Sequence, residues 1–324
     1  MIYIKMKEGQ GLGNQLWNYV VMRSIAKFKS YDFGVLDYEK FKGKDFLFIK
    51  RSSITIPKED LLVPEFFYEN LYYDKPLKNI ACDYDPSILN IKDNVILEGL
   101  FQSEKYLIPN KSIVNEFLSI KKSGFILNYD PENTCILNIR GGEYKRHKNL
   151  ILPKSYWIKA MKNMEFFNPK IQFKIVTDDP RYSNLLFPNI EILKGDIKQD
   201  FLSLKSAKYL IISNSSFSYF PMAINEWPKI IIAPLYWARF GNNLNRWASP
   251  ANCYRGMLWQ NSKGYIVGKE EIELSLNASR NEYKKYKFRL SSEYHKNPLN
   301  DSKIIVICKK IIKIILKIFL PKTF

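Results

Sequence analysis

Three stretches in the middle of the chain decide the fold: "CILNI" (135–139), "KSYWIKAMKNMEFF" (154–167) and "IQFKIVT" (171–177). The first and the third are short apolar runs, which is typical of buried strands. The second repeats its apolar residues at helical spacing. A strand, a helix and another strand in this order predict a β-α-β unit with parallel strands.

The same alternation extends in both directions. Downstream we expect a short helix after Pro180, a strand at 190–193, a helix at 199–208, a strand at 209–213, a helix from about Phe217 to Glu226 and a strand at 229–234. Upstream we expect a strand at 2–6, a helix at about 14–29, strands at 33–36 and 95–99, and a helix from about Ser103. Strands that alternate with helices predict an α/β fold with doubly wound parallel sheets.

The length of 324 residues favours two domains, since an average domain has about 150 residues. The segment 121–134 carries Gly, Asn, Asp and Pro, so we interpret it as the interdomain linker. The predicted organisation is an N-terminal domain at 1–125, a second domain at 126–290 and a tail at 291–324.

The composition limits the possible partners and excludes some classes. With 50 Lys and Arg against 32 Asp and Glu, the formal charge of +18 favours anionic partners such as nucleotides, phosphates, acidic lipids or nucleic acid. The alternative is that the lysines are spread over a solvated surface. Four cysteines without a C-x-x-C pair and two histidines argue against a zinc cluster, and we expect reduced cysteines in a cytoplasmic protein.

The C-terminal run "KIIVICKKIIKIILKIFLPK" (303–322) is both apolar and cationic. Most of its lysines fall on one helical face, which is typical of a helix that lies on an anionic membrane surface. The alternative is a terminal helix packed on the body of the protein. We find no signal peptide and no apolar stretch of the ~18–20 residues that a membrane span requires. The expected location is therefore cytoplasmic, peripheral on the inner face of the membrane.

Polar residues follow three strands of the predicted second sheet, in "NIRGGEY" (138–144), "VTDDP" (176–180) and "SNSSFSYF" (213–220). Ligands of open parallel sheets bind beyond the carboxyl ends of the strands, so these clusters should converge on one crevice. Arg140 can bind a phosphate with two N–H groups while Gly141 and Gly142 allow a close backbone approach. A structural salt bridge is the alternative for Arg140.

Ser215 and Ser216 stand where a strand turns into a helix, so they can bind an anion or simply cap the helix. The pair Asp178–Asp179 invites comparison with the metal-binding D-x-D of many sugar transferases, as does "DYD" (83–85). The other interpretation is a helix start, with Asp179 as the cap and Pro180 in the first turn.

The glycine loop in "EGQGLGNQLWNYV" (8–20) is a near miss to a dinucleotide-binding fingerprint. Asn14 occupies the slot of the third glycine, and no Gly-Lys-Ser/Thr is present, so both the dinucleotide and the P-loop interpretations are disfavoured. The loop predicts a tight, donor-rich turn at a helix N-terminus, with the amides of Asn14 and Gln15 available.

Taken together, these stretches resemble the α-1,2-fucosyltransferase family of bacterial surface-polysaccharide enzymes (glycosyltransferase family 11), and more distantly the protein O-fucosyltransferases. "GLGNQLWNYV" is similar to G-G-L-G-N-Q-M-F-Q-Y-A, and "GLFQSEKYL" (99–107) to G-Y-F-Q-S-x-K-Y-F. "LNIRGGEY" takes the place of H-x-R-R-G-D-Y, so Asn138, Gly141 and Glu143 stand where the family has His, Arg and Asp. "FKIVTDDP" and "SLKSAKYLIISNSSFSYFPMAIN" match the later S-D-D and I-I-A-N-S-S-F-S-W-W motifs.

The resemblance implies a GT-B fold, in which two Rossmann-like domains face a cleft, and a metal-free, inverting transfer from GDP-fucose. It implies that Arg140 contacts the diphosphate and that the nucleotide is surrounded by Asn214, Ser215, Ser216 and Phe217, with Asp178 beside it. The loop residues Gly11, Gly13 and Asn14 would reach the sugar or the phosphates from the opposite domain. We assign catalytic roles to Arg140, Asn14 and Glu143, and Glu143 is followed by Glu8 and Asp178 as candidates for the general base.

The predicted function is a membrane-associated inverting glycosyltransferase with no cofactor. It would transfer L-fucose from GDP-fucose to a hydroxyl of a surface-polysaccharide or lipid-linked oligosaccharide acceptor, in α-1,2 linkage. One alternative keeps the fold and changes the nucleotide-sugar donor. The other is a basic nucleic-acid-binding protein, against which the position of the polar clusters at strand ends argues.

Overall fold

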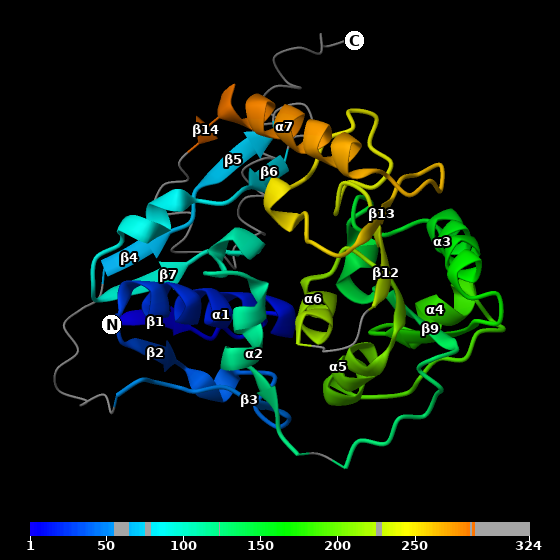
Figure 1. Cartoon of the computed structure of the whole chain (residues 1–324), viewed down its shortest axis with the longest axis horizontal. Helices are drawn as coiled ribbons and strands as arrows, with labels where there is room; N and C mark the ends of the chain where they lie inside the picture. Colours follow the sequence, from blue (N-terminus) through cyan, green and yellow to red (C-terminus); the bar gives the residue numbers. More distant parts are fainter. Residues whose placement is uncertain (55–64, 75–78, 123, 225–228, 286, 289–324) are drawn as a thin grey trace, which may run out of the picture.

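The computed structural model of the chain describes residues 1–54, 65–74, 79–122, 124–224, 229–285 and 287–288. Figure 1 shows two α/β halves side by side, each built on one parallel sheet. The strand order is β2-β1-β7-β4 in the first sheet and β10-β9-β11-β12-β13 in the second. The bounds are Ile2–Lys5 (β1), Phe33–Leu36 (β2), Glu65–Tyr68 (β4), Val95–Glu98 (β7), Thr134–Ile139 (β9), Gln172–Thr177 (β10), Tyr209–Ile212 (β11), Ile230–Pro234 (β12) and Leu258–Gln260 (β13).

All neighbouring strands of these two sheets run parallel, which requires crossover connections. The α-helices of the described chain are Leu12–Lys29 (α1), Val114–Phe117 (α2), Lys154–Phe167 (α3), Pro180–Leu186 (α4), Ile197–Ser206 (α5), Ser216–Ala223 (α6) and Lys269–Lys285 (α7). Short antiparallel strands are Leu47–Phe48 (β3), Leu71–Asp74 (β5), Asn79–Cys82 (β6), Ser119–Ile120 (β8) and Lys287–Phe288 (β14). The predicted α/β class with parallel sheets is confirmed.

The predicted strand at 190–193 is wrong. Ile192 makes a single bridge to Ile175 on the edge of the second sheet. The Ile175 N–H donates to the Glu191 carbonyl at 2.9 Å, and the Leu193 N–H donates to the Ile175 carbonyl at 2.8 Å. The segment touches the edge with one pair of hydrogen bonds and then leaves it, because it must reach Asp196, the cap of α5.

The predicted helix from Ser103 is also wrong. Ser103 caps only one 3-10 turn, Glu104–Tyr106, and the next helical residues form the short turns Lys111–Ile113 and Val114–Phe117. Pro109 explains the interruption, because it has no N–H to donate and disfavours helical backbone at the residue before it. The predicted end of the helix after Phe217, at Glu226, lies outside the described residues, and α6 itself ends at Ala223.

One hydrophobic core runs through both halves. Helices α1 and α6 lie between the two sheets (Figure 1), and Trp17 of α1 is fully buried at their junction. Its ring centroid lies 4.3 Å from that of Tyr219 in α6 and 5.7 Å from that of Tyr254. Two parallel α/β halves packed in this way on either side of a cleft constitute the predicted GT-B architecture.

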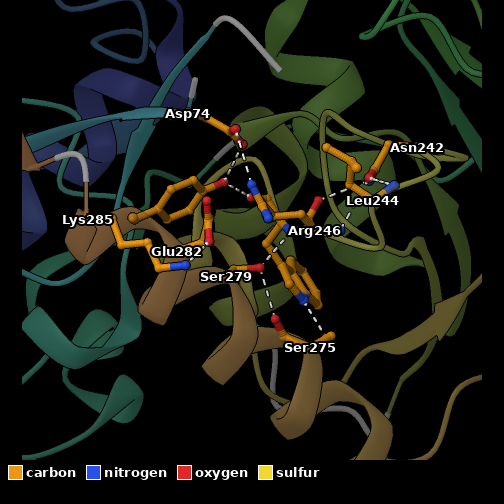
Figure 2. A network of polar contacts seen from close by, with 10 residues as sticks. Asp74, Asn242, Leu244, Arg246, Ser275, Ser279, Glu282 and Lys285 are labelled. Carbon is orange, nitrogen blue, oxygen red and sulfur yellow. Dashed lines mark hydrogen bonds and ion pairs between the residues drawn. The ribbon is translucent and has the colours of Figure 1, made fainter. Parts of the chain in front are cut away.

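Helix α7 follows the second sheet in sequence but crosses back over β5 of the first half (Figure 1). Figure 2 shows how Asp74 of β5 faces Arg246, whose Nη1 lies 3.4 Å from the carboxylate. The Tyr283 hydroxyl of α7 donates to the same carboxylate at 3.1 Å. The predicted second domain, 126–290, therefore contains a helix that contacts the first half, and the domain bounds stay a prediction.

The same helix holds the loop that precedes it. The Trp247 indole N–H donates to the Ser275 hydroxyl at 2.8 Å, and the Trp247 backbone N–H donates to Ser279 at 3.1 Å. Both serines are labelled in Figure 2, on the helix below Arg246. Helix α7 thus contacts both β5 and the loop at residues 246–247, which are far apart from each other in sequence.

The predicted linker at 121–134 runs between β8 and β9, and its described residues before Thr134 form neither helix nor strand. The predicted basic tail at 291–324, with its membrane anchor at 303–322, lies outside the described residues. Membrane contact and location therefore stay predictions. Within the described ranges, none of the helices has the length and apolar character of a membrane span.

Candidate functional site

A cleft of about 620 Å³ opens between the two halves, a volume typical of small-molecule sites. Ten residues predicted from the sequence line it: Gly11, Gly13, Asn14, Arg140, Glu143, Asp178, Asn214, Ser215, Ser216 and Phe217. The glycine loop supplies one wall, and the carboxyl ends of β9, β10 and β11 supply the other. The structure therefore brings these residues together, as the convergence of strand ends predicts. Their individual roles stay predictions.

Gly13 makes the close approach of the two halves possible. A Cβ atom at this position would lie 2.4 Å from the Ser216 carbonyl carbon and 2.5 Å from the Phe217 nitrogen. Both are backbone atoms at the start of α6, so they cannot move aside. A Cβ atom at Gly11 would meet nothing within 4 Å. The contact between the two halves therefore requires a glycine at position 13, whereas it leaves room for a side chain at position 11.

Asn14 ties the halves together. Its Oδ1 accepts one hydrogen bond from Gln102 Nε2 at 2.8 Å and another from the Ser216 hydroxyl at 2.7 Å. Gln102 in turn accepts from Asn252 Nδ2 at 3.2 Å. The Asn14 oxygen is therefore occupied, and only its amide N–H groups remain for the predicted contact with a ligand.

The side chain of Gln15 binds the backbone of the loop at Lys40 and Lys42, a contact that the sequence did not predict. Its Nε2 donates to the Lys40 carbonyl at 2.9 Å, and its Oε1 accepts from the Lys42 N–H at 3.0 Å. This pair of bonds places Lys42 on the wall of the cleft, where its exposed side chain adds a positive charge. The amide of Gln15 is thus used within the protein, contrary to its expected availability.

Arg140 forms the salt bridge that was its alternative role, and it also keeps a free donor. Its Nη1 lies 3.0 Å from Asp178 Oδ2. Its Nε is buried without a hydrogen-bond partner among the described residues. The guanidinium carbon lies 5.4 Å from the centroid of the Tyr144 ring. The buried Nε is a donor in the cleft wall that an anion can satisfy.

The glycines after Arg140 serve packing within the second half. A Cβ atom at Gly141 would lie 2.7 Å from Asp179 Cβ, and one at Gly142 would lie 2.5 Å from Asp178 Oδ2. The Gly141 N–H donates to Asp178 Oδ1 at 2.9 Å. The backbone at Gly141 and Gly142 thus lies close to two aspartates of the protein, whereas a close approach to a phosphate was expected.

Asp179 acts as a helix cap, as one of the two interpretations predicts. Its Oδ1 accepts from the Tyr182 N–H at 3.0 Å, and Pro180 follows it in the first turn of α4. The ion pair with Lys145 and the bond from Tyr182 lower the pKa of this carboxyl. In the motif at 83–85, Asp83 pairs with Arg280 and Asp85 caps a 3-10 turn. Across the described ranges, no group of three or more His, Cys, Asp and Glu side chains could hold a metal.

Residues 214–216 are engaged in the structure of the cleft wall. Ser215 caps α6 by accepting from the Phe217 N–H at 3.3 Å. With its amide oriented to satisfy both neighbours, Asn214 donates to the Leu150 carbonyl at 3.0 Å and accepts from the Ala238 N–H at 3.1 Å. The capping interpretation therefore holds for Ser215. The N-terminus of α6 still presents its positive end to the cleft.

Asp200 is a cleft residue that the sequence analysis missed. Its pKa is raised to about 7, mainly by burial and then by the nearby charges of Asp196 and Asp178, while the charge of Arg140 opposes the rise. A signal was available, because Asp200 lies beside Phe201 and one turn before Leu204 on the buried face of an amphipathic helix. An acidic group in such a position is a candidate for a functional site.

The stability of the protein should depend on pH through Asp200. Its pKa in the folded protein is above the usual 3.8, so ionisation between about pH 4 and pH 7 costs stability, and the cost is complete above pH 7. Allowing for partial solvent exposure, Asp200→Asn should gain roughly 1–2 kcal/mol more at pH 8 than at pH 5. Urea unfolding at the two pH values measures the difference.

The control for this prediction is Glu143→Gln, which changes an exposed carboxyl of the same cleft. Equal gains for Asp200→Asn at pH 5 and pH 8 would contradict the raised pKa.

The described lining of the cleft carries more acidic than basic side chains, although the whole chain is strongly basic. Its lining includes four carboxyl groups and two cationic groups: Glu143, Asp178, Asp196, Asp200, Lys42 and Arg140. Glu8, the second candidate for the general base, is not among the lining residues. Other lining residues missed by the sequence analysis are Gln102 and Trp237. Gln102 lies in the stretch "GLFQSEKYL" (99–107), which resembles a motif of the fucosyltransferase family.

No protein-family model matches the chain. The GT-B architecture, the cleft and a sequence relationship together define it as a glycosyltransferase. The sequence relationship is to an α-1,2-colitosyltransferase of Escherichia coli. The two sequences are 24% identical over 262 residues, which cover 70% of this chain and 89% of the relative.

Solved structures with a similar outline include two bacterial transferases. The fucosyltransferase NodZ from Bradyrhizobium is 13% identical to this chain, with a TM-score of 0.39. The aligned region covers 68% of this chain and 91% of the NodZ chain. The E. coli heptosyltransferase WaaC with ADP is 9% identical to this chain, with a TM-score of 0.40. The aligned region covers 87% of this chain and 98% of the WaaC chain. The assignment to GT-B depends on the two parallel sheets and on the cleft between them.

Proposed function

We propose that this glycosyltransferase transfers L-fucose from GDP-fucose to a hydroxyl of a surface-polysaccharide or lipid-linked oligosaccharide acceptor, with inversion and in α-1,2 linkage. The observation that carries the proposal is the meeting of three features in one cleft: the free Nε of Arg140, the N-terminus of α6 and the carboxyl of Asp200. The name of the E. coli relative, an α-1,2-transferase of a sugar, supports the reaction type.

The diphosphate would bind between Arg140 and the first turn of α6. The buried Nε of Arg140 offers a charged donor, and the helix N-terminus favours a negative group. Lys42 adds a second cation from the opposite wall. As GDP departs, negative charge grows on the diphosphate, so donors fixed in advance stabilise the transition state more than the bound substrate.

The carboxylate of Asp200 would recognise the base. Its two oxygens can accept from the ring N–H and the amino group of guanine, whereas uracil offers a single ring N–H. A base that donates two hydrogen bonds also offsets the cost of ionising this partly buried carboxyl. The proposal therefore favours a guanine nucleotide over a uracil nucleotide.

In the proposed transfer the acceptor oxygen forms a bond to the anomeric carbon of fucose while the bond from that carbon to the β-phosphate oxygen breaks. The acceptor proton passes to Glu143, an exposed carboxyl of the cleft. We assign no metal to this step, because Arg140 engages Asp178, and Lys145 together with the cap of α4 engages Asp179. The leaving diphosphate is stabilised by Arg140, Lys42 and α6.

Ligand-dependent thermal stabilisation tests the donor. GDP and GDP-fucose should raise the unfolding temperature, and UDP-sugars should not, because a ligand that binds the folded state shifts the transition by mass action. GDP-mannose serves as a control for the sugar, and an oligonucleotide for the nucleic-acid alternative. Selective stabilisation by UDP-sugars would reject the fucose donor, and stabilisation by the oligonucleotide alone would reject the enzyme.

A second candidate donor is a nucleotide sugar that carries colitose. The observation in its favour is the name of the E. coli relative, together with Asn138 and Gly141 at positions where fucosyltransferases of the resembling family have His and Arg. Incubation with each donor and mass measurement of the glycosylated product distinguish the two sugars.

A further inference from the structure

An amide oxygen in the wall of the cleft is buried without a partner. Asn138 is 2% exposed and lines the cleft. Its Nδ2 donates to the Val176 carbonyl at 3.4 Å, while its Oδ1 has no hydrogen-bond partner in the part of the chain that the structure describes. Buried polar atoms in native proteins nearly always have a partner, so this atom is in place for a group that the protein itself does not supply.

The direction of the strand places Asn138 on the side of the first half. Side chains two residues apart share one face of a strand, so Ile136 and Asn138 belong to the same face of β9, and Arg140 follows directly after the strand ends at Ile139. Ile136 packs in the core that contains Trp17 of α1, whereas Leu137 and Ile139 pack on the other face with α3. Asn138 therefore lies beneath Arg140, about 7 Å along the strand.

The chemistry of the free atom selects its ligand. An amide oxygen only accepts hydrogen bonds, and the oxygens of a diphosphate also only accept, so Asn138 Oδ1 needs an O–H or N–H group. In the proposed function Arg140 binds the diphosphate and Asp200 binds the base. The sugar is joined directly to the diphosphate, and its hydroxyls are donors next to that group.

We infer that Asn138 Oδ1 accepts a hydrogen bond from one hydroxyl of the transferred sugar and thereby contributes to the choice of that sugar. This inference rests on the proposed function, because it takes the diphosphate at Arg140 as its reference point. Asn138 is a specificity residue here and has no part in the bond-breaking step.

The test compares GDP with GDP-fucose in the full chain by titration calorimetry. Asn138→Leu has a similar shape and no acceptor, so it should bind GDP within about twofold of the unchanged protein and GDP-fucose about 10-fold more weakly. Ser213→Ala is the matched control. Its hydroxyl is also buried without a partner at the end of the adjacent strand, but it does not line the cleft, so neither affinity should change.

Deoxy analogues of the donor test the same bond from the side of the ligand. Among the 2-, 3- and 4-deoxy forms of GDP-fucose, one should bind the unchanged protein about 10-fold more weakly than GDP-fucose, and Asn138→Leu should not distinguish that form from GDP-fucose. The measurement on the unchanged protein does not depend on the folding of the variant, and the measurement on Asn138→Leu assigns the lost bond to this residue.

Two results would overturn the inference and leave the proposed function in place. One is an equal loss of affinity for GDP and for GDP-fucose in Asn138→Leu, which would mean that Asn138 only positions Arg140. The other is equal affinity of the unchanged protein for all three deoxy forms and for GDP-fucose. Failure of the unchanged protein to bind either GDP or GDP-fucose would reject the proposed function and the inference with it.

Discussion

Arg140→Ala should lower turnover with the sugar nucleotide by at least ~10²-fold while the protein stays folded, since removing one preorganised donor at a site of developing charge costs about that much. The variant loses the buried Nε that has no internal partner, and it also removes the counter-charge of Asp178. The first change removes a donor to the diphosphate, and the second leaves the Asp178 carboxylate uncompensated where the diphosphate would bind. Steady-state kinetics with GDP-fucose, together with a thermal unfolding curve, measure the two parts of the prediction.

The matched control is Arg181→Ala, which removes an exposed arginine of α4 that does not line the cleft. It should leave turnover unchanged. Arg140→Lys should fall between the two, because lysine keeps the charge but lacks the planar set of donors. Normal turnover of Arg140→Ala would restrict this residue to its salt bridge with Asp178.

Gly13→Ala is expected to destabilise the protein by roughly 2–3 kcal/mol and to lower activity with it, as overpacking of a rigid interface does. The added methyl would lie 2.4 Å from the Ser216 carbonyl carbon, so α6 would have to move away from α1. That movement would also stretch the hydrogen bond between Ser216 and Asn14. Urea unfolding measures the loss, and the activity at low temperature shows whether the residual folded protein works.

Gly11→Ala provides the control within the same loop. Its backbone φ of −66° is open to alanine, and a methyl there would meet no atom within 4 Å. The variant should lose clearly less stability than Gly13→Ala, at most about 1 kcal/mol, because Gly11 is the N-cap of α1 and alanine is a poorer N-cap than glycine. If Gly11→Ala and Gly13→Ala lose the same stability, the close contact with α6 does not explain the glycine at position 13.

The fold was predictable where local pattern and tertiary environment agree. The helix Lys154–Phe167 has the predicted bounds because Tyr156, Trp157, Ala160 and Met164 repeat at helical spacing and are buried together. The segment 190–193 has the composition of a strand, but a strand also needs a partner along its whole length, which depends on the path of the chain. The region directly after Ser103 forms only one 3-10 turn for a local reason, since Pro109 interrupts the helical pattern.

The location of the site was predictable, and the roles of its residues were less so. Strand ends of a parallel sheet meet at one edge, so Arg140, Asp178 and Ser215 had to come together. Sequence could not reveal that Asn14 bonds to Gln102 of its own half and to Ser216 of the other half, because these residues are 88 and 202 positions away. The raised pKa of Asp200 likewise depends on burial and on charges from other elements.

The stacking of Trp17 on Tyr219 and Tyr254 has a consequence for the way substrates come and go. Rotating one half away from the other would expose these rings to water and break the bonds of Asn14, so a wide hinge opening would cost much of the stability of the protein. Donor and acceptor would instead enter and leave through the mouth of a cleft of nearly constant width. Any rearrangement during turnover would then be confined to loops at its rim, such as the one that carries Lys42.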